Sequence, residues 1–180
     1  MMREEHDFMQ KIVGSMLILF AGTWIGFLKG NELEERIHHM REMRHIFTAL
    51  RQEIAYTRLP LCDAFSRVAD RYPGIFGSWL LTMKDKLLER EEENFQRMWE
   101  HVTRQCLSES KLSHNDMELL TRQGAYMGQC DIGTQTTTMD LFLEQWEERI
   151  LIANSQLANK RKLARCIGVL GSVLVVILLL

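Results

Sequence analysis

One short segment carries side chains whose types and spacing fit a metal site. In the stretch HHMREMRH, His38, Glu42 and His45 fall at i, i+4 and i+7, so a helix would place them on one face. Imidazole and carboxylate groups are common ligands of transition metals. However, Arg41 and Arg44 lie beside them and would repel a cation. We therefore interpret the histidines as solvated helix-surface residues and predict no metal, with a metal-dependent enzyme as the alternative.

Other catalytic chemistry lacks its residues in the sequence. There is no HExxH zinc motif and no glycine-rich phosphate loop of the GxxxxGK or GxGxxG type. The four cysteines are far apart, without a CxxC spacing, and none has an evident paired base. They are Cys62, Cys106, Cys130 and Cys166. We therefore predict reduced structural thiols, no catalytic residue, no cofactor and a protein that is not an enzyme.

The elements that position these side chains are predicted to be helices. The chain of 180 residues has only 2 prolines and 11 glycines, so residues that end helices are scarce. Apolar residues make up 46%, enough for an ordinary core. A net charge of -2 gives no basic excess, which argues against a nucleic-acid partner. We predict an all-α bundle of about six helices, flanked by N- and C-terminal transmembrane helices.

Two uncharged segments at the ends are the predicted membrane spans. Residues 12–28 form a run of 17 and residues 166–180 a run of 15. As helices they would extend about 26 and 22 Å, against a hydrocarbon core of about 30 Å, so the second requires a thinned bilayer. A signal peptide and a core helix are the respective alternatives. The acidic head, the missing A-x-A site and the lack of a polar face favour anchors. Gly22 and Gly26 form a GxxxG motif for membrane-helix packing.

Basic residues near the two predicted spans set the expected orientation. Nine Lys and Arg side chains flank the spans on the inner side, against Arg3 and Lys11 on the outer side. The expected organisation of this multi-pass membrane protein follows from that bias. It comprises an extracytoplasmic tail at 1–11, a transmembrane helix at 12–28, a cytoplasmic helical bundle at 29–165 and a transmembrane helix at 166–180.

Apolar spacing divides the middle of the chain into helices. A stripe with steps of three and four over residues 33–54 predicts a long first helix. Pro60 cannot continue it and is expected in the first turn of the next helix. A turn is expected at residues 72–74, after which further helices begin near Ile75 and Phe95.

The later helices have recognisable caps. Ser113 stands three residues before Asp116, which predicts an N-cap. Gly128 is expected to end that helix in a left-handed conformation, and Asp131 to cap the next. A seam with an average step of 3.5 then predicts one long helix from about Ile132 into the second span, packed beside the first helix as a hairpin.

Taken in order, these features resemble the stage III sporulation protein AB family. The resemblance covers most of the chain and rests on order, spacing and chain length. It is carried by Thr23-Trp24-Ile25-Gly26-Phe27, Leu50, Glu53-Ile54-Ala55-Tyr56, Pro60-Leu61, Ala64, Gly124, Gly128, Asp131, Gln135, Leu170-Gly171 and a terminal ILLL. It implies a small helical bundle similar to the cytoplasmic domain of the inner-membrane platform proteins of type II secretion and type IV pilus machines.

The resemblance also implies a function in endospore formation. It implies a non-enzymatic, membrane-anchored assembly platform in the channel complex between mother cell and forespore. The protein is expected in the outer forespore membrane, with its bundle in the mother-cell cytoplasm. The expected partners are the ATPase stage III sporulation protein AA and other channel components, with further copies of the chain in a homo-oligomer as an additional candidate. A membrane signal transducer and a helical adaptor without an ATPase partner are the alternatives.

The matching positions are interpreted mainly as architectural. Pro60, Gly128 and Asp131, like Ser113, are expected at the starts and stops of helices. Glu53 and Gln135 are candidate partner contacts if they are exposed, and an architectural role for them stays open. The acidic run at 89–93 is interpreted as a solvated helix end, with a partner surface as the alternative.

Overall fold

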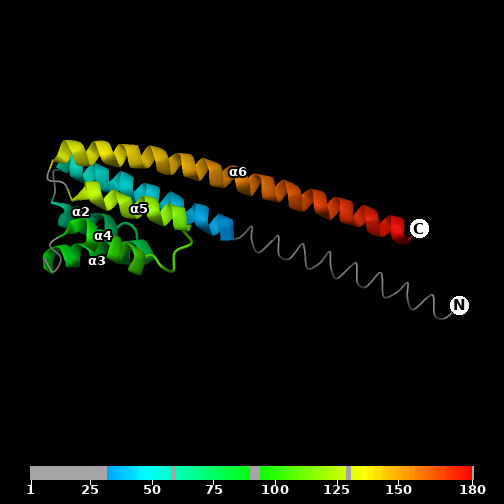
Figure 1. The fold of residues 1–180 in the computed structure, drawn as a ribbon, viewed down its shortest axis with the longest axis horizontal. Coiled ribbons are helices and arrows are strands. Elements are labelled where there is room, and N and C mark those ends of the chain that lie inside the picture. Colours follow the sequence, from blue (N-terminus) through cyan, green and yellow to red (C-terminus); the bar gives the residue numbers. More distant parts are fainter. Residues whose placement is uncertain (1–31, 58–59, 90–93, 129–130, 180) are drawn as a thin grey trace. The chain divides into compact units, whose positions relative to one another are not determined.

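All elements that the computed structural model describes are helices (Figure 1). It describes residues 32–57, 60–89, 94–128 and 131–179 and, beyond residue 160, the side chains of residues 162 and 163 alone. The elements are the first helix (residues 32–52), the π-helical turn η1 (Glu53–Thr57), α2 (Leu61–Ala69), α3 (Ile75–Glu89), α4 (Phe95–Cys106), α5 (His114–Met127) and α6 (Ile132–Leu179). This confirms the predicted all-α class.

The chain divides into two compact units. One unit is Glu35–Leu151, which holds every helix from the first to α5 and the beginning of α6. The other unit contains, among its described residues, 32–34 and the part of α6 from Ile152 onward. The contacts analysed below belong to the Glu35–Leu151 unit.

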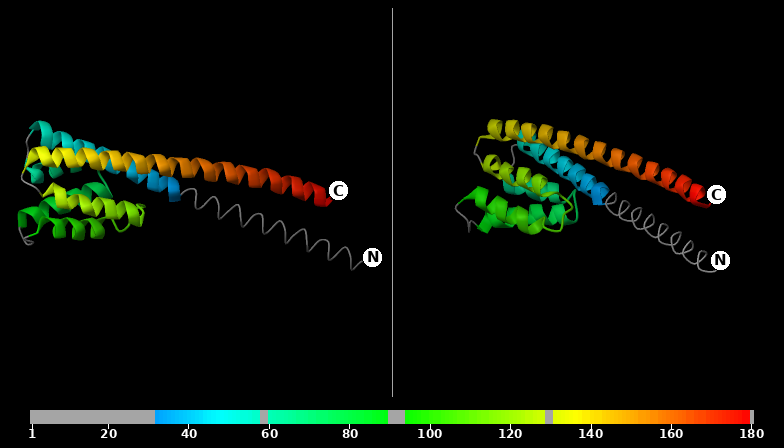
Figure 2. Two further views of the ribbon diagram at one scale, coloured as in Figure 1. Left: turned by 45° about the horizontal axis from the view of Figure 1, so that its top comes forward. Right: turned by 45° about the vertical axis from the view of Figure 1, so that its right-hand side comes forward.

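Within that unit the first helix and α6 run antiparallel, side by side (Figures 1 and 2). The indole N–H of Trp146 donates to the carbonyl of Met40 over 2.7 Å. Two turns further along the first helix, the rings of Phe47 and Phe142 have centroids 4.3 Å apart. The predicted hairpin is therefore present. Its inner face is the part of the predicted stripe from Ile37 to Ile54. All seven apolar members of the stripe are buried: Leu33, Ile37, Met40, Met43, Phe47, Leu50 and Ile54.

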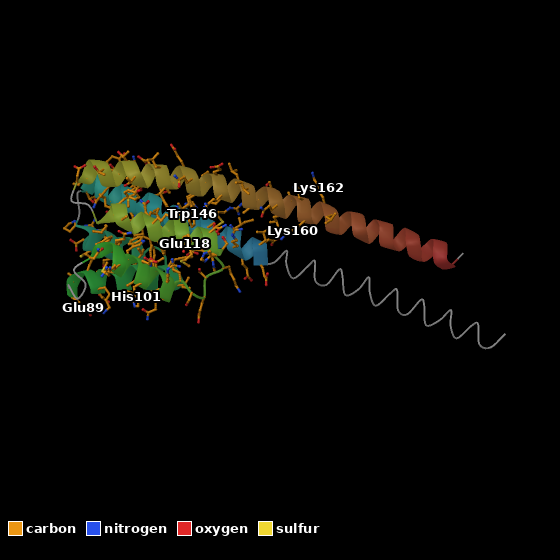
Figure 3. All side chains as sticks on the ribbon, viewed as in Figure 1. Glu89, His101, Glu118, Trp146, Lys160 and Lys162 are labelled. Carbon is orange, nitrogen blue, oxygen red and sulfur yellow. The ribbon has the colours of Figure 1, made fainter. Side chains whose placement is uncertain are left out.

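Three tryptophans with no exposed surface anchor the core, and each indole N–H has an acceptor. Trp79 donates to Thr103 Oγ1 over 3.2 Å and Trp99 to the Leu120 carbonyl over 2.9 Å. The third is Trp146, which Figure 3 labels on α6. A buried indole satisfied in this way fixes the orientation of a large ring, because any other orientation would leave its N–H unpaired.

The second helix begins one residue later than predicted. Pro60 is the N-cap of α2 and not a member of its first turn. Its carbonyl accepts hydrogen bonds from the backbone N–H groups of Asp63 and Ala64, at 3.0 and 3.1 Å. The expected turn at residues 72–74 is present, and Gly74 has a φ of +97° there, a conformation that glycine adopts without strain.

The predicted conformation of Gly128 is wrong. This residue caps α5 with a φ of -78°, which is right-handed and open to any residue. What requires a glycine is space, because a Cβ atom at this position would lie 2.7 Å from Cδ1 of Phe95. Gly128 therefore keeps its architectural role, for a packing reason instead of a backbone one.

The predicted membrane segments fall largely outside the described residues. Residues 1–11 and 12–28, the latter with Gly22 and Gly26, are outside them entirely, and for residues 166–179 only the backbone of α6 is described. Among the residues that the structure describes, no helix combines the length and the apolar character needed to cross a membrane.

Candidate functional site

A buried carboxylate joins three helices of the bundle. Asp116 at the start of α5 has no exposed surface. Its Oδ2 accepts from Ser113 Oγ and the Ser113 backbone N–H, at 2.6 and 3.0 Å, completing the predicted capping box. Arg36 of the first helix donates through Nε and Nη2 at 2.7 and 3.1 Å, and Arg149 of α6 through Nη1 at 3.2 Å. The cap was predictable from local spacing, whereas the two ion pairs were not.

The charge on Asp116 is held in place by these donors. Burial acts to raise the pKa of the carboxyl, but the hydrogen bonds from Arg36 and Ser113 outweigh it and lower the pKa below the ordinary 3.8. The group is therefore ionised at neutral pH and carries no proton to donate. Because it is also inaccessible, it serves as an electrostatic link between helices and not as an acid or base.

A second internal ion pair involves Glu53, one of the two predicted contact residues. Its side chain lies inside, with the residue 6% exposed. Oε1 contacts Nη2 of Arg71 at 2.6 Å, and Oε2 lies 3.6 Å from Nη1 of Arg67. The exposure that a partner contact would need is thus absent at Glu53. Its carboxylate instead ties the π-helical turn to α2 and the loop after it.

The other predicted contact residue, Gln135, belongs to the connection between α5 and α6. It is half-buried, and its Nε2 donates to the carbonyl of Met127 at 2.8 Å. Asp131 accepts from the backbone N–H and the hydroxyl of Thr134, both at 2.7 Å, which confirms it as the cap of α6. These bonds lower the pKa of Asp131. Both residues therefore fasten the helix ends on either side of the connection.

The histidines predicted to lie on the helix surface do so. His38 and His45 are exposed, and the described part of the chain has no group of three or more His, Cys, Asp or Glu side chains placed to hold a metal ion. The neighbouring His39 has a structural role that the sequence did not indicate. Its Nδ1 accepts from the Lys111 backbone N–H at 3.0 Å, and its ring meets that of Phe76 edge-on at 5.4 Å.

Two of the four thiols can be placed. Cys62 and Cys106 are free and half-buried, while the side chains of Cys130 and Cys166 lie outside the described residues. Burial, followed by the nearby Asp63 carboxylate, raises the pKa of the Cys62 thiol. A raised pKa favours the unreactive thiol form, so Cys62 is unsuited to nucleophilic chemistry at neutral pH.

A groove between α5 and α6 is the surface feature that the sequence analysis missed. Its volume is about 320 Å³. Eight residues line it: Leu119, Arg122, Gln123, Tyr126, Thr138, Leu141, Phe142 and Gln145. Tyr126 and Leu141 remain 46% and 53% exposed there. The position of Leu141 in the sequence could have indicated the groove, because this apolar residue lies off the buried seam of α6.

Together, the helices and the internal ion pairs define an α-helical bundle protein in which the described charged clusters link helices. A family model described as stage III sporulation protein AB matches residues 11–180. The chain therefore belongs to the stage III sporulation protein AB family, which confirms the resemblance found in the sequence and associates the chain with sporulation.

Individual relatives agree with this assignment. The stage III sporulation protein AB of Bacillus subtilis (strain 168) is 25% identical over 172 residues, which cover 96% of this chain and 100% of the relative. A solved structure of a stage III sporulation protein AB (SpoIIIAB) is similar with a TM-score of 0.62 at 22% identity, covering 69% of this chain and 97% of the other. The structural similarity shows that the fold is shared.

Proposed function

We propose that the chain is a non-enzymatic, membrane-anchored assembly platform of the channel complex between mother cell and forespore, and that it engages the ATPase stage III sporulation protein AA. One observation carries the proposal: the family match extends over residues 11–180, so it includes the bundle together with both apolar ends. A platform needs a folded contact domain attached to anchors, and the matched region contains the bundle and the two apolar segments that we propose as anchors.

The contacts of the bundle support an architectural role. The carboxylates of Asp116 and Glu53 are directed at arginines of other elements. These groups fix the relative positions of helices, which is what a docking domain requires of its interior. In addition, α6 is one helix from Ile132 to Leu179, so the bundle is connected to the C-terminal apolar segment without an intervening loop.

The proposed location is the outer forespore membrane, with the bundle in the mother-cell cytoplasm. Spans at 12–28 and 166–180 would anchor it, with the tail at 1–11 outside and the Gly22 and Gly26 face packing against another membrane helix. Reporters test this topology directly. Fluorescent protein inserted at the exposed Ser108–Glu109 loop should fluoresce, and alkaline phosphatase fused to either end should be active. The reverse pattern would exclude the proposed orientation.

Binding of the ATPase is tested with the full chain in detergent micelles. The purified chain should retain the stage III sporulation protein AA ATPase on an affinity column, whereas an unrelated protein with two spans in the same detergent should not. Helicity measured on the same sample establishes that the chain is folded. Two results together contradict the platform: the folded chain retains no ATPase, and deletion of the chain in cells leaves the channel complex intact. If the complex is lost but no ATPase binds, the helical adaptor is the better description.

A further inference from the structure

The groove between α5 and α6 contains polar groups without partners. Gln123 is only 5% exposed, and its Nε2 has no hydrogen-bond acceptor in the described structure. A buried amide N–H left without an acceptor costs free energy, so this end of the groove is incompletely satisfied. Arg122 beside it is exposed; among the described residues it forms no salt bridge, and its charge acts at longer range on Glu118, whose pKa is lowered by the hydrogen bond from Arg104 and also by Arg122. The groove thus combines apolar side chains with one exposed cation, Arg122, and one buried amide, Gln123.

A surface with the matching pattern lies on α3 of the same chain. Leu81, Asp85 and Leu88 are spaced at i, i+4 and i+7 and form one ridge along the helix. The two leucines are 41% and 62% exposed, so they form an apolar surface on the outside of the helix. Asp85 is exposed between them and has no ion-pair partner within the described ranges. We call these three residues the α3 ridge.

The ridge and the groove are complementary in charge and in polarity. Each combines large exposed apolar side chains with an exposed charge, and the two charges are opposite: the Asp85 carboxylate on α3 and the Arg122 guanidinium in the groove. An amphipathic helix lying in an apolar groove is a common mode of recognition, in which residues at i, i+4 and i+7 provide the contacts. The ridge leucines are seven residues apart, roughly 10 Å along the helix axis.

We propose that copies of this chain associate head to tail, with the α3 ridge of one copy in the α5–α6 groove of the next. The Asp85 carboxylate accepts hydrogen bonds from the Arg122 guanidinium. Leu81 and Leu88 cover the exposed parts of Tyr126 and Leu141. Because the two surfaces differ, a pair of copies keeps one free ridge and one free groove, so association forms a ring if the rotation closes and a filament if it does not. This goes beyond the proposed function, since it involves no other protein.

A photo-cross-link in the native membrane tests the contact with the full chain. The chain carries p-benzoylphenylalanine at position 88, and a matched sample carries it at position 151, which is equally exposed on α6 outside the groove. Irradiation should give an adduct of twice the chain mass from position 88, with the cross-linked peptide inside residues 119–145, and none from position 151. An adduct between two α3 helices, an adduct only with another protein, or no adduct overturns the proposal.

Charge reversal tests the pairing of specific residues in the same assay. Asp85→Arg and Arg122→Asp should each reduce the adduct roughly tenfold or more, because each places like charges opposite one another. The double variant restores the attraction in reverse and should recover the adduct. Arg97→Asp, at an exposed arginine of α4, changes the net charge equally and should have no effect. Loss of the adduct in the double variant, in a chain of unchanged helicity, refutes the Asp85–Arg122 pair.

Mixing two variants distinguishes a head-to-tail contact from a symmetric one. Leu88→Arg blocks the ridge and Leu141→Arg blocks the groove, both at exposed positions. Each full-length variant alone in micelles should sediment as a monomer, whereas an equimolar mixture should give a dimer that grows no further. The unaltered chain should form larger species. A mixture that stays monomeric, or single variants that associate as the unaltered chain does, rules the arrangement out.

Discussion

The buried carboxylate of Asp116 offers the sharpest test of how the bundle is held together. Asp116→Asn keeps the size of the side chain and one acceptor oxygen but removes the charge that two arginines approach. Arg36 and Arg149 would then be left without their counter-ion, and the one remaining oxygen could not accept from both the arginines and Ser113. We expect the bundle to fold with markedly lower stability, because three elements lose their common link.

The magnitude follows from the burial of the groups involved. Removing one member of a buried ion pair costs about 3–5 kcal/mol. The side chains of Arg36 and Arg149 keep exposures of 23% and 35%, so both recover some hydration when the pair is broken. The lower end, about 3 kcal/mol, is therefore expected. For a unit of this size each kcal/mol moves the melting temperature by roughly 3 °C, so the midpoint should fall by roughly 10 °C.

The assay is urea and thermal unfolding of the full chain in micelles, followed by fluorescence of the buried tryptophans. Glu118→Gln, two residues further along α5 at the surface, is the matched control and should change little (Figure 3). Folding lowers the pKa of Asp116. The difference in stability between the unaltered chain and Asp116→Asn should therefore stay constant down to about pH 3.8, and it should disappear as the pH falls through the lower pKa of the folded state. An Asp116→Asn variant as stable as the control would refute the proposed role of this network.

Three further predictions concern smaller features. Gly124→Ala should destabilise the bundle by about 1–3 kcal/mol, because its Cβ would lie 2.3 Å from Cδ1 of Trp99. The control Gly133→Ala, at an exposed site, should not destabilise it, and urea midpoints measure both effects. Glu53→Gln should speed hydrogen exchange in the π-helical turn, and unchanged exchange would contradict its linking role. Burial lowers the pKa of His39 below 6.5, so the stability of the chain should fall as the pH drops below 6.5. His39→Asn should lessen this loss of stability, measured between pH 7.5 and 5.5.

Local patterns in the sequence were sufficient for the helices and their starts. A helix start depends on one side chain and the backbone groups three residues later, so Ser113 with Asp116 and Asp131 with Thr134 could be read directly. The stripe in the first helix follows from its 3.6-residue period, and its buried members are the predicted ones. These features need no knowledge of the tertiary structure.

Long-range polar contacts could not be read in the same way. Arg36 is 80 residues from Asp116 in sequence, and nothing in its own neighbourhood distinguishes it from Arg41, which lies on the same helix. Glu53 likewise meets Arg71 only because the chain turns back through α2. Whether a charged residue is a surface group or an internal link is decided by packing, so the partner roles considered for Glu53 and Gln135 could not be judged from spacing.

For Gly128 the predicted helix end is correct, but the predicted reason for a glycine there, a left-handed conformation, is wrong. Gly124 of α5 and Gly128, which caps this helix, lie against aromatic side chains of α4, at Trp99 and Phe95 respectively. Four residues apart, they share one helix face and remove the two Cβ atoms that would hold α4 away from α5. Close approach of two helices thus explains both glycines with one cause, whereas a left-handed cap would explain neither. It also accounts for the indole of Trp99 reaching the carbonyl of Leu120, a contact that needs α4 and α5 at short range.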